Sequence, residues 1–488
     1  MSDLEDKSSA VISQDKINHD VDEVNFTEEE LARLEKIYVK LDFRIIPALW
    51  CLYFLTSFGS SAYGNTLTMN YTEGHSLKQT LNLTSKDTST ASALYYVGYI
   101  IFDVPMNIIM TKLAPQAWLS RIVISVGLVY SCYAALHGAG AIIAIRFISG
   151  VCGAGTWPGM SYYISLWYPP HRMTRRIGYY FTAAQMSAAV AGLVAAGFQR
   201  IDGNRGMEGW RWLFLTYGVI TVAVGISLSV WLPDNQIDRQ SRFKFMNKLK
   251  ELNVYPLDES DRLLHERDMS RYRTSLSWTW KDIYTIFLDI KLWPLIMMYF
   301  GVVGTGFGLA VFGTTLIKSV LGLSSIDVSL LYAPIWLFDL AAILLITPFS
   351  DKFKKLRPLI FSGATVIIIV GLVVCTYAGP KWSRYGGLLI AGFGLGPTVP
   401  TCMSMTAEIF GRKYGDIGVA VSAALVSGLG NLGSVTATYA LYSGWPADAA
   451  RQYEYSNMML VVICGFSIIS AGVCVLFQRV IKDKKTLY

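Results

Sequence analysis

Two charged side chains stand inside long apolar stretches of the sequence. Arg146 lies in the stretch 139–168, and Asp339 lies at the centre of the stretch 328–350. A charge in such surroundings is costly unless it is paired or faces water. Arg146 could bind an anionic group or act on a proton carrier through its charge. Alternatively, it could donate hydrogen bonds to backbone carbonyls of a neighbouring helix.

Asp339 could carry a proton, because removal of a carboxyl group from water favours its protonated form. The alternative is a structural role, in which the carboxylic acid is hydrogen-bonded to a neighbouring helix and holds the two helices together. The proton is the expected coupling ion, and we expect no other cofactor.

Asp103 lies just before Pro105 in a third stretch, 88–111. Tyr95, Tyr99 and Asp103 fall at i, i+4 and i+8, so a helix would carry two phenols and a carboxyl group on one face. That face could line a cavity, or Asp103 could pair with an Arg or Lys near the membrane surface. The proximity of the following loop favours the second role, which is that of a gate.

Further charged residues are suited to gating. Asp351, Lys352 and Arg357 begin the loop after the stretch that contains Asp339. Charged pairs in such a loop would hold one conformation and exchange partners in another. Glu408 is followed within one turn by basic residues, which favours a side chain that extends to the membrane surface.

Uncharged side chains could also contact a substrate. Gln185 and Asn431 are polar residues in apolar stretches that could hydrogen-bond a substrate or only link helices. The aromatic candidates for contact with a ring are Tyr63, Tyr95, Tyr96, Tyr99, Trp157 and Trp336. Aromatic residues are also common at membrane interfaces, so a cavity role is one of two alternatives for each.

Several functional classes are not expected. The sequence shows no Walker loop, metal-ligand cluster or nucleophile–base signature, so we expect neither an enzyme nor a metal site. The seven cysteines lie mostly in apolar stretches and are interpreted as packing residues. The net charge of +7 is scattered, which argues against binding of nucleic acid.

The elements that position these residues are predicted membrane helices. The chain of 488 residues is 53% apolar and 16% charged, against 45–50% and about 25% in soluble domains. A spanning helix needs about 20 apolar residues. Twelve stretches are candidates: Ile45–Thr72, Thr88–Thr111, Trp118–Leu136, Ala139–Tyr168, Ile177–Gln199, Trp212–Pro233, Leu292–Ile317, Val328–Ser350, Pro358–Pro380, Tyr385–Ala407, Ile417–Ala447 and Tyr455–Gln478.

The predicted fold is an all-α integral membrane protein with twelve helices in two pseudo-symmetric bundles of six. Its segments are an acidic tail (1–44), a first bundle (45–233), a central loop (234–288), a second bundle (289–478) and a basic tail (479–488). Basic residues are concentrated after the even-numbered helices and in the last tail. The positive-inside rule therefore places the central loop and both termini in the cytosol.

An internal similarity supports the two repeats. Predicted helices four and ten are both rich in glycine and broken by proline at a similar depth. The residues are Gly150, Gly153, Gly155, Pro158 and Gly159 in helix four, and Gly392, Gly394, Gly396, Pro397 and Pro400 in helix ten.

Two local motifs flank the first helix. Thr27 and Glu30 have the spacing of a capping box, and they predict a short amphipathic helix with Leu31, Leu34, Tyr38 and Leu41 on one face, lying along the membrane surface. Asn70 and Asn82 begin glycosylation sequons in a predicted external loop.

Six segments together resemble the major facilitator superfamily and, within it, the fungal allantoate-permease-like family of anion:cation symporters. They are Tyr95–Asn107, Lys112–Trp118, Arg146–Gly155 with Pro158-Gly159, Gly209–Phe214, Ser350–Lys352 and Gly428–Gly433, and the segment Tyr162–Pro169 is also close to a family signature. The resemblance covers roughly residues 36–480. It implies secondary transport by alternating access, with a coupling role for Arg146.

The sequence departs from this family's pattern where charge is usual. Gly59 and Ser60 stand where members often carry an Asp-Arg pair, and Gly153 stands at the position of an acid in helix four. These replacements remove charge from the first-half cavity. They weaken the expectations of a carboxylate bound by that arginine and of proton coupling through those acids.

We therefore predict a secondary transporter of a small polar organic solute, such as a vitamin, an amino-acid-like compound or an organic anion, across a fungal membrane. Proton symport by a monomer in the lipid bilayer of the plasma membrane is expected, with an endomembrane as the alternative. Two other functions remain open: a proton-driven exporter of drugs, which efflux of a dye would support, and a nutrient sensor of the same fold, which signalling without flux would support.

Overall fold

The computed structural model describes residues 26–233, 257–270, 280–442 and 444–480. All regular elements in these ranges are helices. Ten of them are long and apolar enough to cross a membrane. Helix α4 (Ser85–Lys112) and the second part of α17 (Thr398–Gly430) complete the predicted twelve spans. The predicted all-α membrane fold is confirmed.

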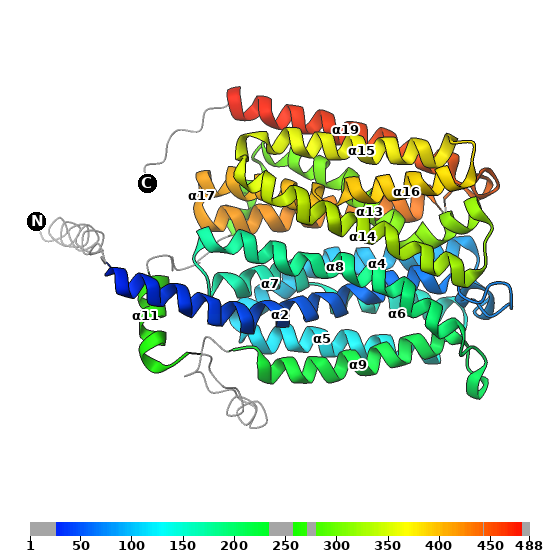
Figure 1. The fold of residues 1–488 in the computed structure, drawn as a ribbon, viewed down its shortest axis with the longest axis horizontal. Helices are drawn as coiled ribbons and strands as arrows, with labels where there is room; N and C mark the ends of the chain where they lie inside the picture. The colour runs from blue at the N-terminus through cyan, green and yellow to red at the C-terminus, as the bar shows by residue number, and fades with distance from the viewer. Residues whose placement is uncertain (1–25, 234–256, 271–279, 443, 481–488) are drawn as a thin grey trace, which may run out of the picture.

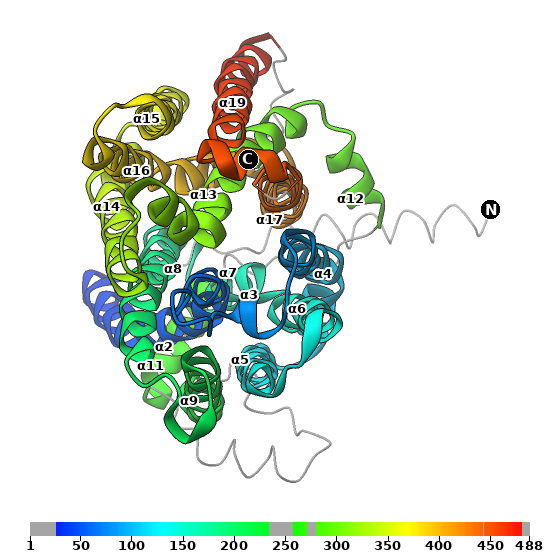
Figure 2. The same cartoon turned by 90° about the vertical axis from the view of Figure 1, so that its right-hand side faces the viewer.

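The spanning helices form two bundles, which lie side by side in the end-on view (Figure 2). The first bundle contains α2 (Glu28–Thr66), α4, α5 (Pro115–Cys132), α6 (Gly138–Gly153), α7 (Thr156–Ser165), α8 (Pro170–Gln199) and α9 (Gly209–Trp231). The second contains α13 (Leu292–Leu321), α14 (Ser325–Lys352), α15 (Arg357–Tyr377), α16 (Lys381–Leu395), α17, α18 (Leu432–Val435), the π-helix η4 (Thr436–Leu441) and α19 (Glu454–Val480). Helix α2 begins and helix α19 ends at the same end of the molecule (Figure 1).

Short helices lie in the connections. They are α3 (Leu77–Thr80), α11 (Glu259–Ser270), α12 (Trp280–Phe287), η1 (Tyr133–Ala135), η2 (Asn204–Gly206), η3 (Lys354–Leu356) and η5 (Pro446–Arg451). Helices α11 and α12 are the described parts of the predicted central loop; the rest of that loop and most of both predicted tails lie outside the described residues.

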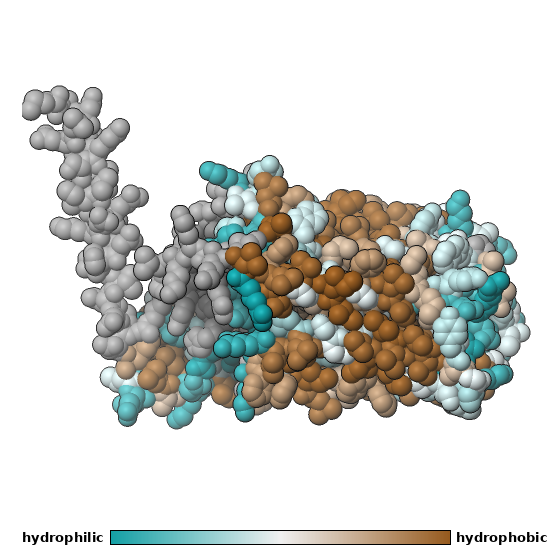
Figure 3. All heavy atoms as spheres, turned by 90° about the horizontal axis from the view of Figure 1, so that it is seen from above, coloured by the Kyte–Doolittle hydropathy of each residue, from teal (hydrophilic) through white to brown (hydrophobic). Residues whose placement is uncertain are grey.

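An apolar band covers the middle of the molecular surface, with hydrophilic residues toward both ends (Figure 3). Exposed side chains of the spanning helices include Leu128, Ile148, Val219, Leu345, Val366 and Phe466. Apolar surface on this scale is stable in contact with lipid and not with water. The protein is therefore a multi-pass integral membrane protein.

Small residues let neighbouring helices approach closely. A Cβ built on Gly127 of α5 would lie 2.8 Å from the carbonyl oxygen of Gly218 on α9. In the second bundle, a Cβ on Gly371 of α15 would overlap the backbone of Ala391 on α16. Helix pairs in lipid pack through such contacts because the solvent supplies little hydrophobic driving force.

Helices four and ten are both interrupted, as predicted. Helix α6 ends before Gly155, which has a left-handed φ of +80°, and α7 starts at the next residue. Helix α16 ends before Gly396 and Pro397. Helix α17 then contains spans ten and eleven: a Cβ on Gly418 would lie 2.5 Å from the Phe410 carbonyl oxygen, whereas residues eight apart in a straight helix are about 12 Å apart. The chain must reverse direction there.

The amphipathic segment before the first span differs from its prediction. The capping box of Thr27 and Glu30 is present, but the helix that it starts continues without a break to Thr66. Its side chains Leu34, Tyr38 and Leu41 are buried. The segment packs against α11 and is not a separate surface helix, so residues 28–44 of the predicted acidic tail belong structurally to α2.

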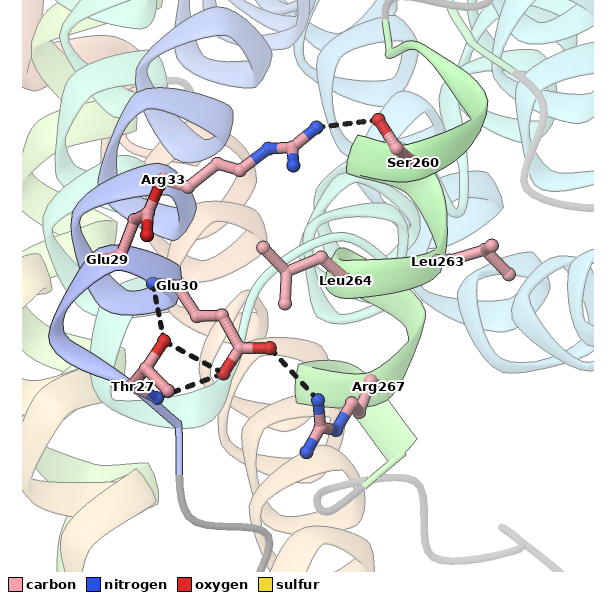
Figure 4. A pocket seen from close by; sticks show the side chains of 8 residues that line it. All are labelled: Thr27, Glu29, Glu30, Arg33, Ser260, Leu263, Leu264 and Arg267. Carbon is pink, nitrogen blue, oxygen red and sulfur yellow. Dashed lines mark hydrogen bonds and ion pairs between the residues drawn. The ribbon is translucent and has the colours of Figure 1, made fainter.

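Ion pairs fasten α11 to the start of α2, an arrangement that we call the α2–α11 clasp. Arg33 Nε donates to Asp261 Oδ1 at 2.7 Å, and Lys40 Nζ donates to Asp261 Oδ2 at 3.1 Å. Figure 4 shows the exposed side of the clasp, where Arg267 reaches Glu30 across a shallow pocket. Because the sequence separation exceeds 200 residues, local patterns could not reveal this contact.

Candidate functional site

The two bundles touch each other at the end opposite the termini. A Cβ on Gly64 of α2 would lie 2.6 Å from the Ala310 carbonyl oxygen on α13. A Cβ on Gly192 of α8 would lie 2.5 Å from the Ser329 carbonyl oxygen on α14. Only glycine permits such backbone contacts. The candidate site lies between the bundles, and its charged residues come from α4, α6 and α14.

Arg146 of α6 is fully buried among phenol rings. Its guanidinium carbon lies 4.0 Å from the centre of the Tyr63 ring and 4.5 Å from the centre of the Tyr95 ring. Its three nitrogens make no hydrogen bond to the described residues, so the predicted alternative of bonds to backbone carbonyls is not found there. A cation–π contact that is shielded from water contributes about 2 kcal/mol of stabilisation. This is less than the desolvation penalty of several kcal/mol for burying the charge of the guanidinium group. Arg146 can therefore receive an anionic group.

The position of the missing charged pair is filled by an aromatic ring. A Cβ built on Gly59 would overlap the ring of Tyr130, whose hydroxyl is buried and makes no hydrogen bond to the described chain. Tyr130 stacks on Tyr133 at 4.9 Å and on Phe214 at 5.8 Å between ring centres. The sequence alone did not identify Tyr130 and Tyr133 as residues of this site. The absence of a side chain at Gly59 could have indicated them, because the space that it leaves in a close-packed interior is filled by a neighbouring side chain.

Asp339 of α14 is buried opposite Gln185 of α8, which is the polar group that acts on its carboxyl. Its Oδ1 makes no hydrogen bond within the described part of the chain, and neither does Gln185 Oε1. The structure thus brings together two residues that the sequence predicted only separately. A buried acid with few hydrogen-bond partners is suited to exchange a proton.

Asp103, the predicted gate residue, lies in the inner part of α4. It is buried, and its Oδ1 accepts a hydrogen bond of 2.9 Å from the backbone N–H of Gly155. This bond reaches from α4 to the break between α6 and α7. Tyr99, one turn before Asp103, is half-buried on the same helix.

In the predicted gating loop after α14, Arg357 forms an ion pair with a residue of α17. Arg357 Nη1 donates to Glu408 Oε2 at 2.9 Å, so Glu408 is engaged in an ion pair. Lys352 is exposed, with its Nζ 5.7 Å from the centre of the Phe353 ring. The side chain of Asp351 lies outside the described part of the structure.

The other aromatic candidates make separate ring contacts. Trp157 of α7 packs against Tyr53, Tyr180 and Phe181, with ring centres 6.0, 5.7 and 5.3 Å away. Tyr96 crosses between the bundles to Phe307, 5.0 Å away. The predicted contacts Trp336 and Asn431 are buried, Asn431 at the junction of α17 and α18.

The two sequons differ in exposure. Asn70 is buried, and its Nδ2 donates to the Gln199 carbonyl at 3.3 Å. Asn82 is exposed. Glycosylation needs an accessible side-chain amide, so the prediction for Asn70 does not fit this conformation, while Asn82 fits it.

Two helical bundles in a membrane, with buried charges at their junction, define the class of secondary carriers. The family model described as Major Facilitator Superfamily matches residues 49–438. The chain belongs to this superfamily and is a transporter of small molecules rather than an enzyme.

Individual relatives support this membership. "Vitamin H transporter 1" of Schizosaccharomyces pombe is 44% identical, with 97% of this chain and 85% of the relative covered. A quinolone resistance transporter of Acinetobacter baumannii is 26% identical, with 86% and 91% covered. The crystal structure of a bacterial homolog of the human lysosomal transporter Spinster has a TM-score of 0.63 at 15% identity, with 89% and 96% covered, and shares the fold.

Proposed function

We propose that the protein imports vitamin H, or a similar small carboxylate that carries a ring, together with a proton. The observation that supports this proposal best is the buried Arg146, whose nitrogens make no hydrogen bond to a carboxylate or carbonyl oxygen of the described residues. A guanidinium group offers only donors and needs a counter-charge when buried. A substrate carboxylate would supply both the charge and the acceptors, after Tyr63 or Tyr95 moves aside.

The choice of substrate rests on chemistry and on one relative. A protein 44% identical over nearly the whole chain is named a vitamin H transporter. Vitamin H has one carboxylate on an alkyl chain and one fused ring system. The aromatic group around Trp157 would contact the ring, while Arg146 would bind the carboxylate.

Alternating access would follow from tilting of the two bundles around this site. Asp339 is the proposed proton carrier, with Gln185 as its hydrogen-bond partner. A carboxylate paired with Arg146 and a protonated Asp339 leave no unpaired charge at these positions. Such neutrality lowers the cost of reorienting the site between the two sides of the membrane.

The setting of this activity is also a proposal. We infer a plasma membrane protein that works as a monomer, with the α2–α11 clasp and both termini on the cytosolic side. Substrate then enters from the end where the bundles now touch. Direct partners would be the substrate, the proton and lipid.

Uptake of labelled vitamin H by cells that lack their own vitamin H transport tests the proposal. Wild-type protein should give uptake that increases as external pH falls, and the vitamin H amide, which lacks the carboxylate, should not compete. Arg146→Gln should raise the half-saturation concentration roughly 100-fold, equivalent to about 3 kcal/mol for a buried charged pair. Arg146→Lys is the matched control and should retain part of the affinity. Equal competition by the acid and the amide would contradict the proposal.

A further inference from the structure

The two broken helices share a sequence pattern but differ at one decisive residue. Residues 150–158 read GVCGAGTWP and residues 392–400 read GFGLGPTVP, so Gly155 corresponds to Pro397. The local structure agrees with this alignment. Thr156 Oγ1 donates to the Gly153 carbonyl at 2.6 Å, and Thr398 Oγ1 donates to the Leu395 carbonyl at 2.6 Å.

The helices that cross these breaks also correspond. A Cβ on Gly150 would overlap the Tyr95 carbonyl of α4, and a Cβ on Gly392 would lie 2.6 Å from the Ile335 carbonyl oxygen of α14. Helices two and four therefore cross at the same place as helices eight and ten. This common crossing point allows the acids of α4 and α14 to be compared.

Each crossing helix carries one buried acid that reaches its break. Asp103, eight residues after Tyr95, accepts the Gly155 N–H. Asp339, four residues after Ile335, lies with its Oδ1 2.8 Å from the place of a Cβ on Gly396. The acids are one helical turn apart in register, and both lie on the face that meets the broken helix.

The difference between Gly155 and Pro397 changes the chemistry of the two acids. The Gly155 N–H stabilises a carboxylate at Asp103, because an amide donor at the start of α7 favours negative charge. Proline has no N–H. Pro397 directly follows Gly396, the residue that approaches Asp339 Oδ1, so the chain offers no amide donor at that point. Asp339 Oδ1 makes no hydrogen bond in the described chain.

We propose that Asp103 is a positioning residue that holds the break of helix four through its bond to the Gly155 N–H, and that Pro397 enables Asp339 to exchange the coupling proton by withholding an amide donor. The second part rests on the proposed function. Helix α6 carries Arg146 nine residues before Gly155, so the bond from Asp103 also fixes the end of the helix that presents the guanidinium.

Few groups in the described part of the chain act on Asp339. Asp339 faces Gln185 from α8 and the backbone of Gly396 beyond α16, and no ionisable side chain among the described residues acts on its carboxyl. Asp103 acts electrostatically on the phenols of Tyr99 on its own helix and Tyr299 on α13. A change in pH response can therefore be traced to these groups.

Pro397→Ala is the decisive variant. Pro397 has φ −78° and ψ −11°, which alanine adopts without strain, so the variant adds an N–H and little else. We expect the pH of half-maximal uptake to fall by about one unit, because a carboxylate that is stabilised by a hydrogen bond needs a higher proton concentration to become protonated. Pro400→Ala, in the same helix, is the matched control and should not shift it. Equal shifts for both variants would overturn the role of Pro397.

Infrared titration of the purified protein gives a readout that does not depend on transport. The band of a protonated carboxyl should disappear in Asp339→Asn and should require lower pH in Pro397→Ala than in wild-type protein. If uptake of vitamin H fails but these bands behave as stated, the proposed substrate is wrong and the assignment of the proton site stands. If the band persists in Asp339→Asn, the assignment is wrong.

The positioning role of Asp103 is tested by a pair of variants. In Asp103→Asn the side-chain oxygen still accepts the Gly155 N–H, so uptake should fall less than fivefold with an unchanged pH profile. In Asp103→Ala the bond is lost, and we expect a loss of at least tenfold in maximal rate together with weaker binding through Arg146. A shifted pH profile in Asp103→Asn would instead make Asp103 a proton carrier and overturn the proposal.

Discussion

The ammonium nitrogen of Lys318 lies 3.5 Å from the centre of the Tyr71 ring, and this contact joins the two bundles at the end opposite the termini. Lys318 comes from the last turn of α13, and Tyr71 follows α2. Gln199 of α8 makes a second connection there by donating to Ser329 Oγ of α14 at 2.9 Å. Both contacts must break before this end can open.

Removal of the cation–π contact should therefore favour opening. Lys318→Gln forfeits about 1 kcal/mol, which corresponds to a roughly fivefold larger open population. Labelling of a cysteine introduced at Val311, which is buried against Gly64, should become faster by about that factor, while Lys318→Arg, which keeps the cation, should label like the protein with Lys318. Unchanged labelling in Lys318→Gln would show that the contact does not hold this end closed.

The α2–α11 clasp should weaken in acid. Burial acts to raise the pKa of Asp261, but its hydrogen bonds with Lys40 and Arg33 outweigh burial and hold the pKa below its usual value of 3.8. A carboxyl group with a depressed pKa contributes stability above its unfolded-state pKa and loses it as pH falls through the folded-state value. The protection of α11 amides against hydrogen exchange, relative to an unfolded chain at the same pH, should thus be high at pH 5–7 and fall below about pH 4.

The matched variants for the clasp are Asp261→Asn and a charge exchange. Asp261→Asn should give fast exchange in α11 at every pH, because the amide cannot pair with two cations. The double variant Arg33→Asp with Asp261→Arg should recover part of the protection. If hydrogen exchange in α11 is the same in both variants as in the wild-type protein, the apolar contacts of α11 alone hold it against α2.

If the loop of the two sequons is external, as we propose, only one of them should carry a glycan. Asn82 is exposed, whereas the amide of Asn70 is buried and donates a hydrogen bond. Asn82→Gln should therefore abolish the shift in gel mobility caused by glycosidase treatment, and Asn70→Gln should leave it intact. The reverse result would contradict the arrangement of this loop, and absence of any glycan would contradict the proposed orientation.

Gly59 should not tolerate a side chain while Tyr130 is present. Gly59→Ala forces the Tyr130 ring to move, and overpacking of this kind costs about 1–3 kcal/mol. The midpoint of thermal unfolding in detergent should fall by several degrees. Gly197→Ala in α8 is the control, because a Cβ there meets no atom within 4 Å; it should be neutral. Recovery of the midpoint in Gly59→Ala with Tyr130→Ala would confirm the cause.

Much of the fold follows from local sequence. Long apolar stretches predict spans because lipid demands both apolar surface and internal backbone hydrogen bonds. Clusters of glycine and proline likewise predicted the breaks near Gly155 and Pro397, since these residues weaken a helix where they occur together, although single prolines such as Pro47 and Pro105 lie inside continuous helices. The helical continuation of α2 toward Thr27 was missed, because its polar turns are stabilised by α11, which is distant in sequence.

The candidate site was predictable only in part. Intramembrane charge identified Arg146, Asp103 and Asp339, because buried charges are rare without a function. Their partners were not predictable: Gly155 for Asp103, Tyr63 for Arg146 and Glu408 for Arg357 each lie on another helix. Such pairs depend on helix rotation and depth, which periodicity in one stretch does not determine.

The docking of α11 has a mechanical consequence for the whole carrier. Since α11 is fastened to the first bundle and α12 leads into the second, only residues 271–279 connect one rigid body to the other on this side. Ten residue steps span at most about 35 Å. The α2–α11 clasp thus shortens the part of the linker that can extend between the two bundles. The length of residues 271–279 sets an upper limit on how far the two bundles can separate on this side.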